Sequence, residues 1–190
     1  MPSTYEVSED KIWYDPKTQL LFFYGEIQIS SASKLLRIIC RLEADPEIKE
    51  YSFVITSGGG DLVTAINMYD ILKSSKKLKA TFAWDMLASA AIYPFLSSNN
   101  RYCSIHTQFV LHPGSWKGGE TEYTAPSLKT QYCFNAKLDE IAFSLLTNLT
   151  NVNQSLIDEL AKTGEWYLNA HEAQGYCIVT EIRNAPTFQT

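Results

Sequence analysis

Short apolar runs of strand length alternate with amphipathic helical segments along the first half of the chain. Residues 20–24, 51–56 and 80–84 are apolar runs rich in aromatic and β-branched side chains, a composition that favours strands. Between them, residues 30–42 and 62–72 repeat apolar side chains at helical spacing, with the serines at 30 and 31 as candidate N-caps. We therefore predict βαβ units in a layered α/β fold, with right-handed connections between parallel strands.

The second half of the chain is predicted to continue this mixed pattern. Further strands are expected over residues 101–105, 108–111 and 177–182. Further helices are expected over residues 87–96 and 126–147, followed by two short helices, one capped by Asn153 and one beginning at an Asn169–Glu172 capping box.

Composition favours one globular domain and argues against several partner classes. Of the 190 residues, 45% are hydrophobic and 19% are charged, a balance unlike that of disordered or fibrous chains. The net charge of −5 has the wrong sign for a broad nucleic-acid surface. The apolar stretch 81–96 contains Asp85 and Pro94, so it is too polar and too short to span a membrane. No signal peptide is visible at the N-terminus, and we expect a cytoplasmic protein.

The cysteines give no sign of a metal site or a disulfide framework. Cys40, Cys103, Cys133 and Cys177 are widely spaced, with no C-x-x-C pair and no histidine at zinc spacing. We expect reduced and mostly buried thiols, and neither a metal nor a cofactor.

A glycine-rich turn follows the second predicted strand. The segment Ser57-Gly58-Gly59-Gly60 allows positive φ angles and close approach of another chain. Backbone N–H groups beside a helix N-terminus favour developing negative charge. A plain tight turn would have the same sequence, whereas a phosphate loop is disfavoured because no Gly-Lys-Ser/Thr ending follows.

Ser89 and His112 are the candidate reactive side chains. Small neighbours around Ser89 leave room for a substrate, although a packed helix N-terminus gives the same pattern. His112 ends an apolar strand, and strand ends often present site residues in α/β sheets. A purely structural histidine is the commoner case. Of the other histidines, His106 lies in a predicted turn and His171 lies inside the predicted capping box.

In their order and spacing, these features resemble the proteolytic subunit of the Clp protease (ClpP) family. The resemblance extends from about residue 20 to residue 182. The matching motifs are Ile55-Thr56-Ser57-Gly58-Gly59-Gly60, Ala65-Ile66-Asn67-Met68-Tyr69-Asp70, Ala88-Ser89-Ala90, Val110-Leu111-His112 and Leu168-Asn169-Ala170-His171-Glu172-Ala173 with Gly175. It implies repeated ββα units of the crotonase/ClpP-like type, which form a layered sheet core with a protruding handle helix.

The resemblance also implies a set of catalytic roles for a serine endopeptidase. Ser89 would be the nucleophile, and His112 would take its proton and return it to the leaving amine. Glu165 would occupy the place of the family's aspartate and hold the imidazole. The backbone N–H groups of Gly60 and Ala90 match the positions of the family's oxyanion hole.

Several residues depart from the family pattern. Asp85 stands where the family has a glycine before the nucleophile, and Gly58 replaces the proline of the turn. Pro94 falls early in the helix expected after Ser89 and is predicted to kink it. Asp158 or Asp85 could supply the third catalytic group instead of the glutamate.

The resemblance further implies a single peptidase domain, residues 1–190, and an assembly. That domain would comprise an N-terminal segment 1–17, a handle region 114–147 and a tail 184–190. The family forms stacked heptameric rings that enclose the active sites, are fed by an AAA+ unfoldase and degrade unfolded polypeptides. An extended substrate could add a strand near Gly118-Gly119.

Three other functions remain open from the sequence. The chain could be an inactive ClpP-like paralogue that supports a ring or binds peptides. A crotonase-type enzyme would activate thioesters without a serine nucleophile, and a signal-peptide-peptidase type would pair serine with a lysine base. The Ser/His pair disfavours the former, and the lack of an obvious buried lysine disfavours the latter.

Overall fold

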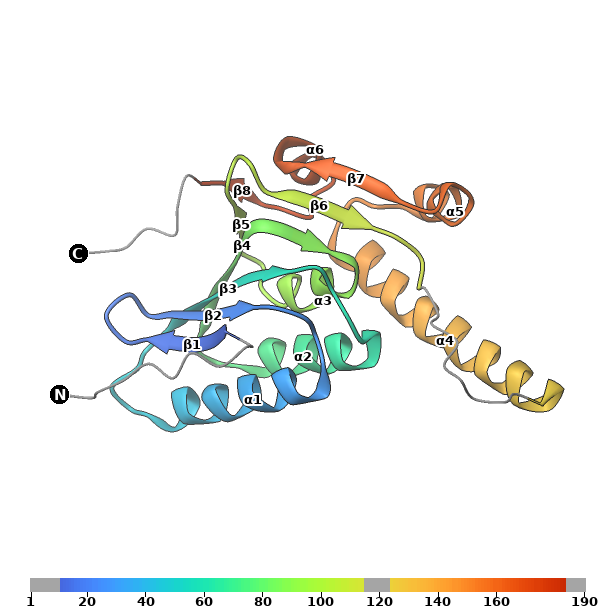
Figure 1. Ribbon diagram of the computed structural model, residues 1–190. Coiled ribbons are helices and arrows are strands. Elements are labelled where there is room, and N and C mark those ends of the chain that lie inside the picture. The colour runs from blue at the N-terminus through green and yellow to red at the C-terminus, as the bar shows by residue number, and fades with distance from the viewer. Residues whose placement is uncertain (1–10, 115–123, 184–190) are drawn as a thin grey trace.

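A mixed eight-stranded sheet with helices packed against it forms the body of the protein (Figure 1). The computed structural model describes residues 11–114 and 124–183. The strands are β1 (Lys11–Asp15), β2 (Leu20–Tyr24), β3 (Tyr51–Ser57), β4 (Leu78–Ala88), β5 (Arg101–Cys103), β6 (Gln108–Leu111), β7 (Trp166–Asn169) and β8 (Glu181–Ile182). The helices are α1 (Ile29–Ala44), α2 (Leu62–Ser74), the 3₁₀ turn η1 (Ser89–Ala91), α3 (Ile92–Phe95), α4 (Ala125–Leu149), α5 (Gln154–Thr163) and α6 (Ala170–Gly175). The predicted layered α/β fold is confirmed.

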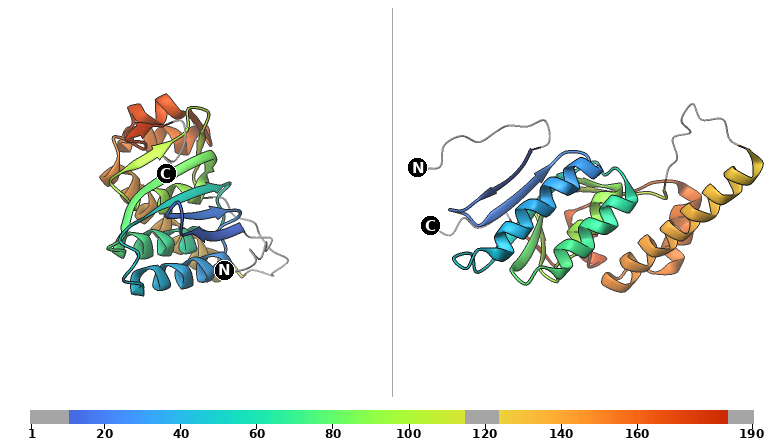
Figure 2. Two further views of the ribbon diagram at one scale, coloured as in Figure 1. Left: turned by 90° about the vertical axis from the view of Figure 1, so that its left-hand side faces the viewer. Right: turned by 90° about the horizontal axis from the view of Figure 1, so that it is seen from below.

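The sheet is parallel at its centre. Its order is β1-β2-β3-β4-β5-β8, and β6 pairs with the far part of β4 and with β7. Strands β2 to β5 run parallel, whereas β1 and β7 are antiparallel to their neighbours. Helices α1 and α2 lie side by side on one face (Figures 1 and 2). The core between sheet and helices contains fully buried side chains such as Phe53, Ile55, Met68 and Leu72, whose burial is the main favourable term in folding.

Parallel pairing brings the candidate site residues to one edge of the sheet. Strand β3 ends at Ser57, which pairs with Leu87 of β4, and Ala88 of β4 pairs with Val110 of β6. Because these strands run in the same direction, the residues that follow them lie side by side. The glycine turn follows β3, Ser89 follows β4 and His112 follows β6.

Residues 87–96 are not the continuous helix that the sequence predicts. Strand β4 extends through Ala88 because Leu87 and Ala88 pair with β6. Only a 3₁₀ turn and the one-turn helix α3 follow, and Pro94 lies inside α3. The serine at position 89 therefore lies directly at the end of a strand.

The capping predictions are confirmed except at α1. Asn153 accepts a hydrogen bond from the Leu156 N–H, and Asn169 forms the predicted capping box. Helix α1 instead begins after Gln28, whose N–H donates to the hydroxyl of Ser31 in the first turn. Ser31 is thus part of a capping box rather than the N-cap.

The prediction of mostly buried cysteines is wrong. Cys103 is buried in the sheet, where desolvation raises the pKa of its thiol to about 12. Cys40, Cys133 and Cys177 are exposed, and all are free thiols. They lie on helices or a turn outside the core rather than on a central strand.

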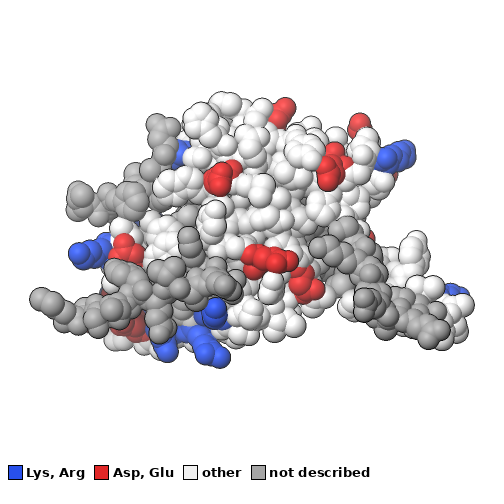
Figure 3. Space-filling model, viewed as in Figure 1, with Lys and Arg blue, Asp and Glu red and all other residues white. Residues whose placement is uncertain are grey.

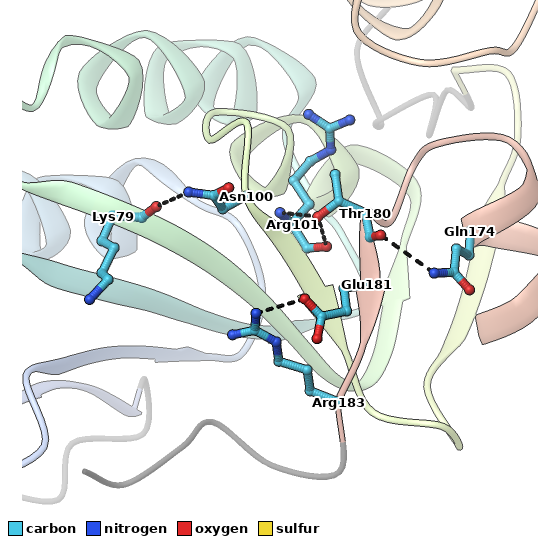
Figure 4. A network of polar contacts seen from close by, with 7 residues as sticks. All are labelled: Lys79, Asn100, Arg101, Gln174, Thr180, Glu181 and Arg183. Atoms are coloured by element: carbon cyan, nitrogen blue, oxygen red, sulfur yellow. Dashed lines mark hydrogen bonds and ion pairs between the residues drawn. The ribbon is translucent and has the colours of Figure 1, made fainter.

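Arg101 attaches the C-terminal part of the chain to the sheet. Its guanidinium is buried and donates to the carbonyls of Ile178, Ser98, Leu149 and Cys177 at 2.7–3.0 Å. Its backbone also exchanges hydrogen bonds with Thr180, and an Arg183–Glu181 ion pair lies close by (Figure 4). Burial lowers the pKa of the guanidinium.

This attachment corrects the prediction of a last strand over residues 177–182. Only Glu181 and Ile182 form a strand, β8. The carbonyls of Cys177 and Ile178 are taken by Arg101, and the N–H groups of Ile178 and Val179 donate to Ala173. These backbone groups are therefore not available to a sheet ladder.

Helix α4 projects from the body of the molecule, as the handle prediction requires (Figure 2). Its buried residues are Ala142 and Leu146 near its C-terminal end. Its exposed large apolar residues are Leu128, Tyr132, Phe134 and Ile141. The first half of the helix therefore presents apolar surface outside the core.

The surface charge is dispersed on the face shown in Figure 3. Lys and Arg side chains of the described residues occupy small separate patches among acidic and uncharged surface there. Within the described ranges, none of the helices is sufficiently long and apolar to cross a bilayer.

Candidate active site

A cavity of about 350 Å³ lies at the edge of the sheet where β3, β4 and β6 end. The sheet side of its wall contains four residues predicted to be catalytic: Gly60, Ser89, Ala90 and His112. Helix α4 forms much of the opposite wall. The other lining residues are Asp61, Leu62, Val63, Tyr93, Gly114, Gln131, Phe134, Asn135, Leu138, Asp139 and Phe143.

Ser89 occupies a sharp turn between β4 and η1. Its φ is +56°, a left-handed conformation that is uncommon for a residue with a β-carbon. The side chain is half-buried and lines the cavity. A serine held in this way at a strand end presents its hydroxyl to the cavity rather than to the core.

The backbone conformation at position 85 explains why an aspartate can stand where the family has a glycine. Asp85 stands at the family's glycine position, and its φ of +66° shows that a left-handed residue is required there. Asp tolerates this conformation better than most side chains. The requirement arises from a register shift, because Ile55 pairs with Ala83 whereas Ser57 pairs with Leu87.

His112 carries its proton on Nδ1. Its Nδ1 lies 2.7 Å from the carbonyl oxygen of Pro113. Because a carbonyl oxygen can only accept, Nδ1 must be the donor, and the lone pair of the neutral imidazole is then on Nε2. This is the tautomer that a general base needs.

Glu165 lies next to His112 along the sheet but does not line the cavity. Strands β6 and β7 are antiparallel, and Leu111 pairs with Trp166, so His112 and Glu165 are the next residues beyond this pair. The exposed carboxylate of Glu165 accepts a hydrogen bond from the hydroxyl of Tyr167. This bond and the carboxylate charge raise the pKa of Tyr167.

The two other carboxylates considered for the third catalytic role are placed elsewhere. Asp85 and Asp158 do not line the cavity. The carboxylate of Asp158 accepts a hydrogen bond from Gln154 on its own helix. Of the carboxylates predicted from the sequence, Glu165 is therefore the one that the sheet register places beside His112.

The glycine turn packs directly against the serine turn. A β-carbon on Gly59 would lie 2.6 Å from the β-carbon of Ser89 and 3.1 Å from the nitrogen of Ala90. The N–H of Ile27 donates to Gly59, and its carbonyl accepts from Asp61. These two bonds turn the N–H of the intervening Gly60 away from Ile27.

Comparison with known proteins shows the family to which the chain belongs. The family model of the Clp protease matches residues 8–186. The chain belongs to the Clp protease family. It is 20% identical over 169 residues to the ATP-dependent Clp protease proteolytic subunit 3, chloroplastic, of Arabidopsis thaliana, covering 87% of this chain and 53% of the relative. This chain therefore spans about half the length of that relative.

A second relative and a solved structure give the same result. The ATP-dependent Clp protease proteolytic subunit 1 of Rhodopirellula baltica is 20% identical over 171 residues, covering 87% of this chain and 72% of the relative. A mutant of ClpP1 from Listeria monocytogenes superposes with a TM-score of 0.77 at 22% identity, covering 88% of this chain and 92% of that one. This likeness supports the Clp protease fold.

Sequence reasoning missed a row of polar residues on the wall that α4 contributes. Gln131, Asn135 and Asp139 follow one another at intervals of four residues and all line the cavity. Side chains at this spacing share one face of a helix. The apolar residues of α4 predicted the helix itself, and the polar i, i+4 row was a usable signal for this wall of the cavity.

Proposed function

We propose that the chain is a serine endopeptidase subunit with Ser89 as the nucleophile and His112 as the base. The observation that supports this most strongly is the common cavity of Ser89, His112, Gly60 and Ala90. Membership of the Clp protease family supports a peptidase more generally.

The reaction follows from the chemistry of these groups. The Ser89 hydroxyl oxygen attacks the peptide carbonyl carbon while Nε2 of His112 takes the hydroxyl proton. The backbone N–H groups of Gly60 and Ala90 donate to the oxyanion, and one such donor contributes roughly 10²–10³ in kcat. The C–N bond then breaks as the imidazolium returns the proton to the leaving amine. Water, deprotonated by the same imidazole, hydrolyses the resulting acyl-enzyme.

Glu165 is the proposed third member of the catalytic group. Its position next to the last ladder pair, Leu111–Trp166, on the side where His112 follows Leu111, supports this role, and rotation of its exposed side chain away from Tyr167 would direct the carboxylate toward the imidazole. While Glu165 is bonded to Tyr167, the Pro113 carbonyl keeps the imidazole of His112 in the required tautomer. A carboxylate would add charge stabilisation for the imidazolium.

Glu165→Gln is therefore expected to lower kcat by about a hundredfold. This loss is smaller than the ~10⁴ that follows when a triad histidine adopts the wrong tautomer, because Pro113 preserves the tautomer here. Steady-state hydrolysis of a fluorogenic peptide measures kcat. Tyr167→Phe is the matched control, because it removes the present partner of Glu165 and should leave kcat equal or higher. An unchanged kcat in Glu165→Gln would exclude Glu165 from the catalytic group.

Covalent labelling with a fluorophosphonate probe tests the function itself. The wild-type protein should be labelled on Ser89, and both Ser89→Ala and His112→Ala should lose the label because nucleophile and base are each required. Ser33→Ala, at an exposed serine of α1, should be labelled like the wild type. A folded wild-type protein that takes up no label would instead be an inactive ring subunit or a peptide-binding module.

We further propose that the chain is one peptidase domain that assembles into stacked heptameric rings, receives unfolded polypeptide and is fed by an AAA+ unfoldase. The exposed apolar residues Leu128 and Tyr132, one turn apart on α4, support association, because neighbouring apolar residues on a protein surface often mark an interaction site. Both curated relatives are named as proteolytic subunits of an ATP-dependent protease. The predicted strand addition at Gly118-Gly119 lies outside the described residues, as do the tail and most of the N-terminal segment. The cytoplasmic location stays a prediction.

A further inference from the structure

The wall that α4 adds to the active-site cavity contains polar side chains. Asn135 and Asp139 of α4 line the same cavity as the proposed nucleophile, Ser89. The buried Nδ2 of Asn135 has no hydrogen-bond partner among the described residues. An unpaired buried donor is unfavourable, and an acceptor on a bound peptide would satisfy it.

The charge of the cavity lining is negative. The charged lining residues are Asp61 and Asp139, and no Lys or Arg stands among the described residues of the lining. Asp61 is already used, because it caps α2 and accepts from the N–H and the hydroxyl of Thr64. Asp139 is therefore the carboxylate that remains for a ligand.

Asp139 is half-buried and has no cationic partner among the residues that the structure describes. It receives a hydrogen bond from the backbone N–H of Gly114, and it forms no ion pair with any described residue. Burial raises its pKa although the Gly114 bond opposes this shift. Burial and then the charge of Asp139 also raise the pKa of Tyr93, another lining residue. A cation bound beside Asp139 would offset the desolvation of the carboxylate.

Apolar side chains accompany the carboxylate. Leu138 and Phe143 of α4 and the ring of Tyr93 line the same cavity. Lysine and arginine bury their aliphatic stems against such surfaces while the charged end finds a polar partner. The volume of about 350 Å³ suits one long side chain together with its backbone, and is near the lower limit for ligand pockets.

We propose that Asp139 binds the cationic side chain of a lysine or arginine residue next to the scissile bond, so that this peptidase prefers basic residues there. This inference rests on the proposed function for the identity of its ligand, a peptide. Asn135 would donate to a peptide carbonyl, and Asp139 would form a charge-assisted hydrogen bond with the ammonium or guanidinium group.

Peptide binding to the Ser89→Ala protein tests this preference without requiring hydrolysis. Fluorescein-labelled alanine-rich peptides that differ only at one central residue, lysine, glutamine or glutamate, would be titrated and followed by fluorescence anisotropy. The lysine peptide should bind about tenfold more tightly than the glutamine peptide, because a hydrogen bond to a charged group contributes at least this factor. The glutamate peptide should bind most weakly.

Asp139→Asn, introduced into the same Ser89→Ala protein, should abolish the preference for the lysine peptide over the glutamine peptide. The asparagine oxygen can still accept from Gly114, so the wall is expected to keep its shape. Glu140→Gln is the control, since it removes a neighbouring carboxylate on α4 that is exposed and does not line the cavity. It should preserve the preference.

The outcomes separate this inference from the proposed function. Equal affinities for the lysine and glutamine peptides would overturn the role of Asp139, even if Ser89 is labelled by the probe. A lysine preference that depends on Asp139 would support it, even in a protein that takes up no label. The comparison among peptides needs no mutation at position 139, so misfolding of that variant would not prevent a result.

Discussion

Gly60→Ala is expected to lower the free energy of unfolding by about 3 kcal/mol, since strained backbone and lost hydrogen bonds each contribute 1–3 kcal/mol. A β-carbon at this position would lie 2.2 Å from the carbonyl oxygen of Ile27, and the φ of Gly60 is +141°. The chain would have to separate from Ile27 and lose the two hydrogen bonds that flank the bridge. Urea denaturation at a fixed protein concentration measures the change.

The same substitution should lower kcat of the folded fraction by roughly 10²–10³, the usual effect of losing one oxyanion donor. Gly58→Ala is the matched control in the same turn, because its β-carbon would meet only the terminal methyl group of Met86 at 3.6 Å. It should leave kcat unchanged and stability equal or up to about 1 kcal/mol higher. A Gly60→Ala protein with wild-type stability and kcat would contradict both the steric and the catalytic argument.

Arg101→Met is expected to destabilise the protein by about 4 kcal/mol. The substitution removes every guanidinium donor to Ser98, Leu149, Cys177 and Ile178. Each buried carbonyl that loses its partner costs roughly 1–3 kcal/mol, although water would reach some of them. The midpoint of urea unfolding gives the free energy change, and hydrogen exchange should show the segment around residue 178 opening first.

Arg183→Met provides the comparison for this prediction. Arg183 pairs with Glu181 and lies 3.5 Å from the ring centre of Tyr102, but it is on the surface. Exposed ion pairs contribute about 0–1 kcal/mol, so this variant should lose no more than about 1 kcal/mol. If the two variants were equally stable, Arg101 would not be the attachment point of the C-terminal segment.

The sequence was sufficient to predict the central strands, because apolar runs specify strands. That Ser89 and His112 belong to one site was predicted from the resemblance to the family, and both residues line the same cavity. Asp85 was visible in the sequence as a departure from the family's glycine. Its left-handed conformation shows that the backbone requirement is retained although the residue differs.

The features that the sequence did not predict depend on contacts between distant residues. Strand β7 forms through pairing with β6, and the segment before β8 is shaped by Arg101. The present partner of Glu165 is a side chain on its own strand, which no motif specifies. Asp139 reaches the cavity only because α4 crosses the edge of the sheet.

Helix α4 has two parts with different surroundings. Asn135 and Asp139 line the cavity, whereas Leu128 and Tyr132, nearer the N-terminal end of the helix, are exposed. A subunit that packs on this exposed end and displaces the helix would also reshape the cavity. By thermodynamic reciprocity, a peptide held by the helix must then strengthen or weaken subunit association by the same factor by which association changes peptide affinity.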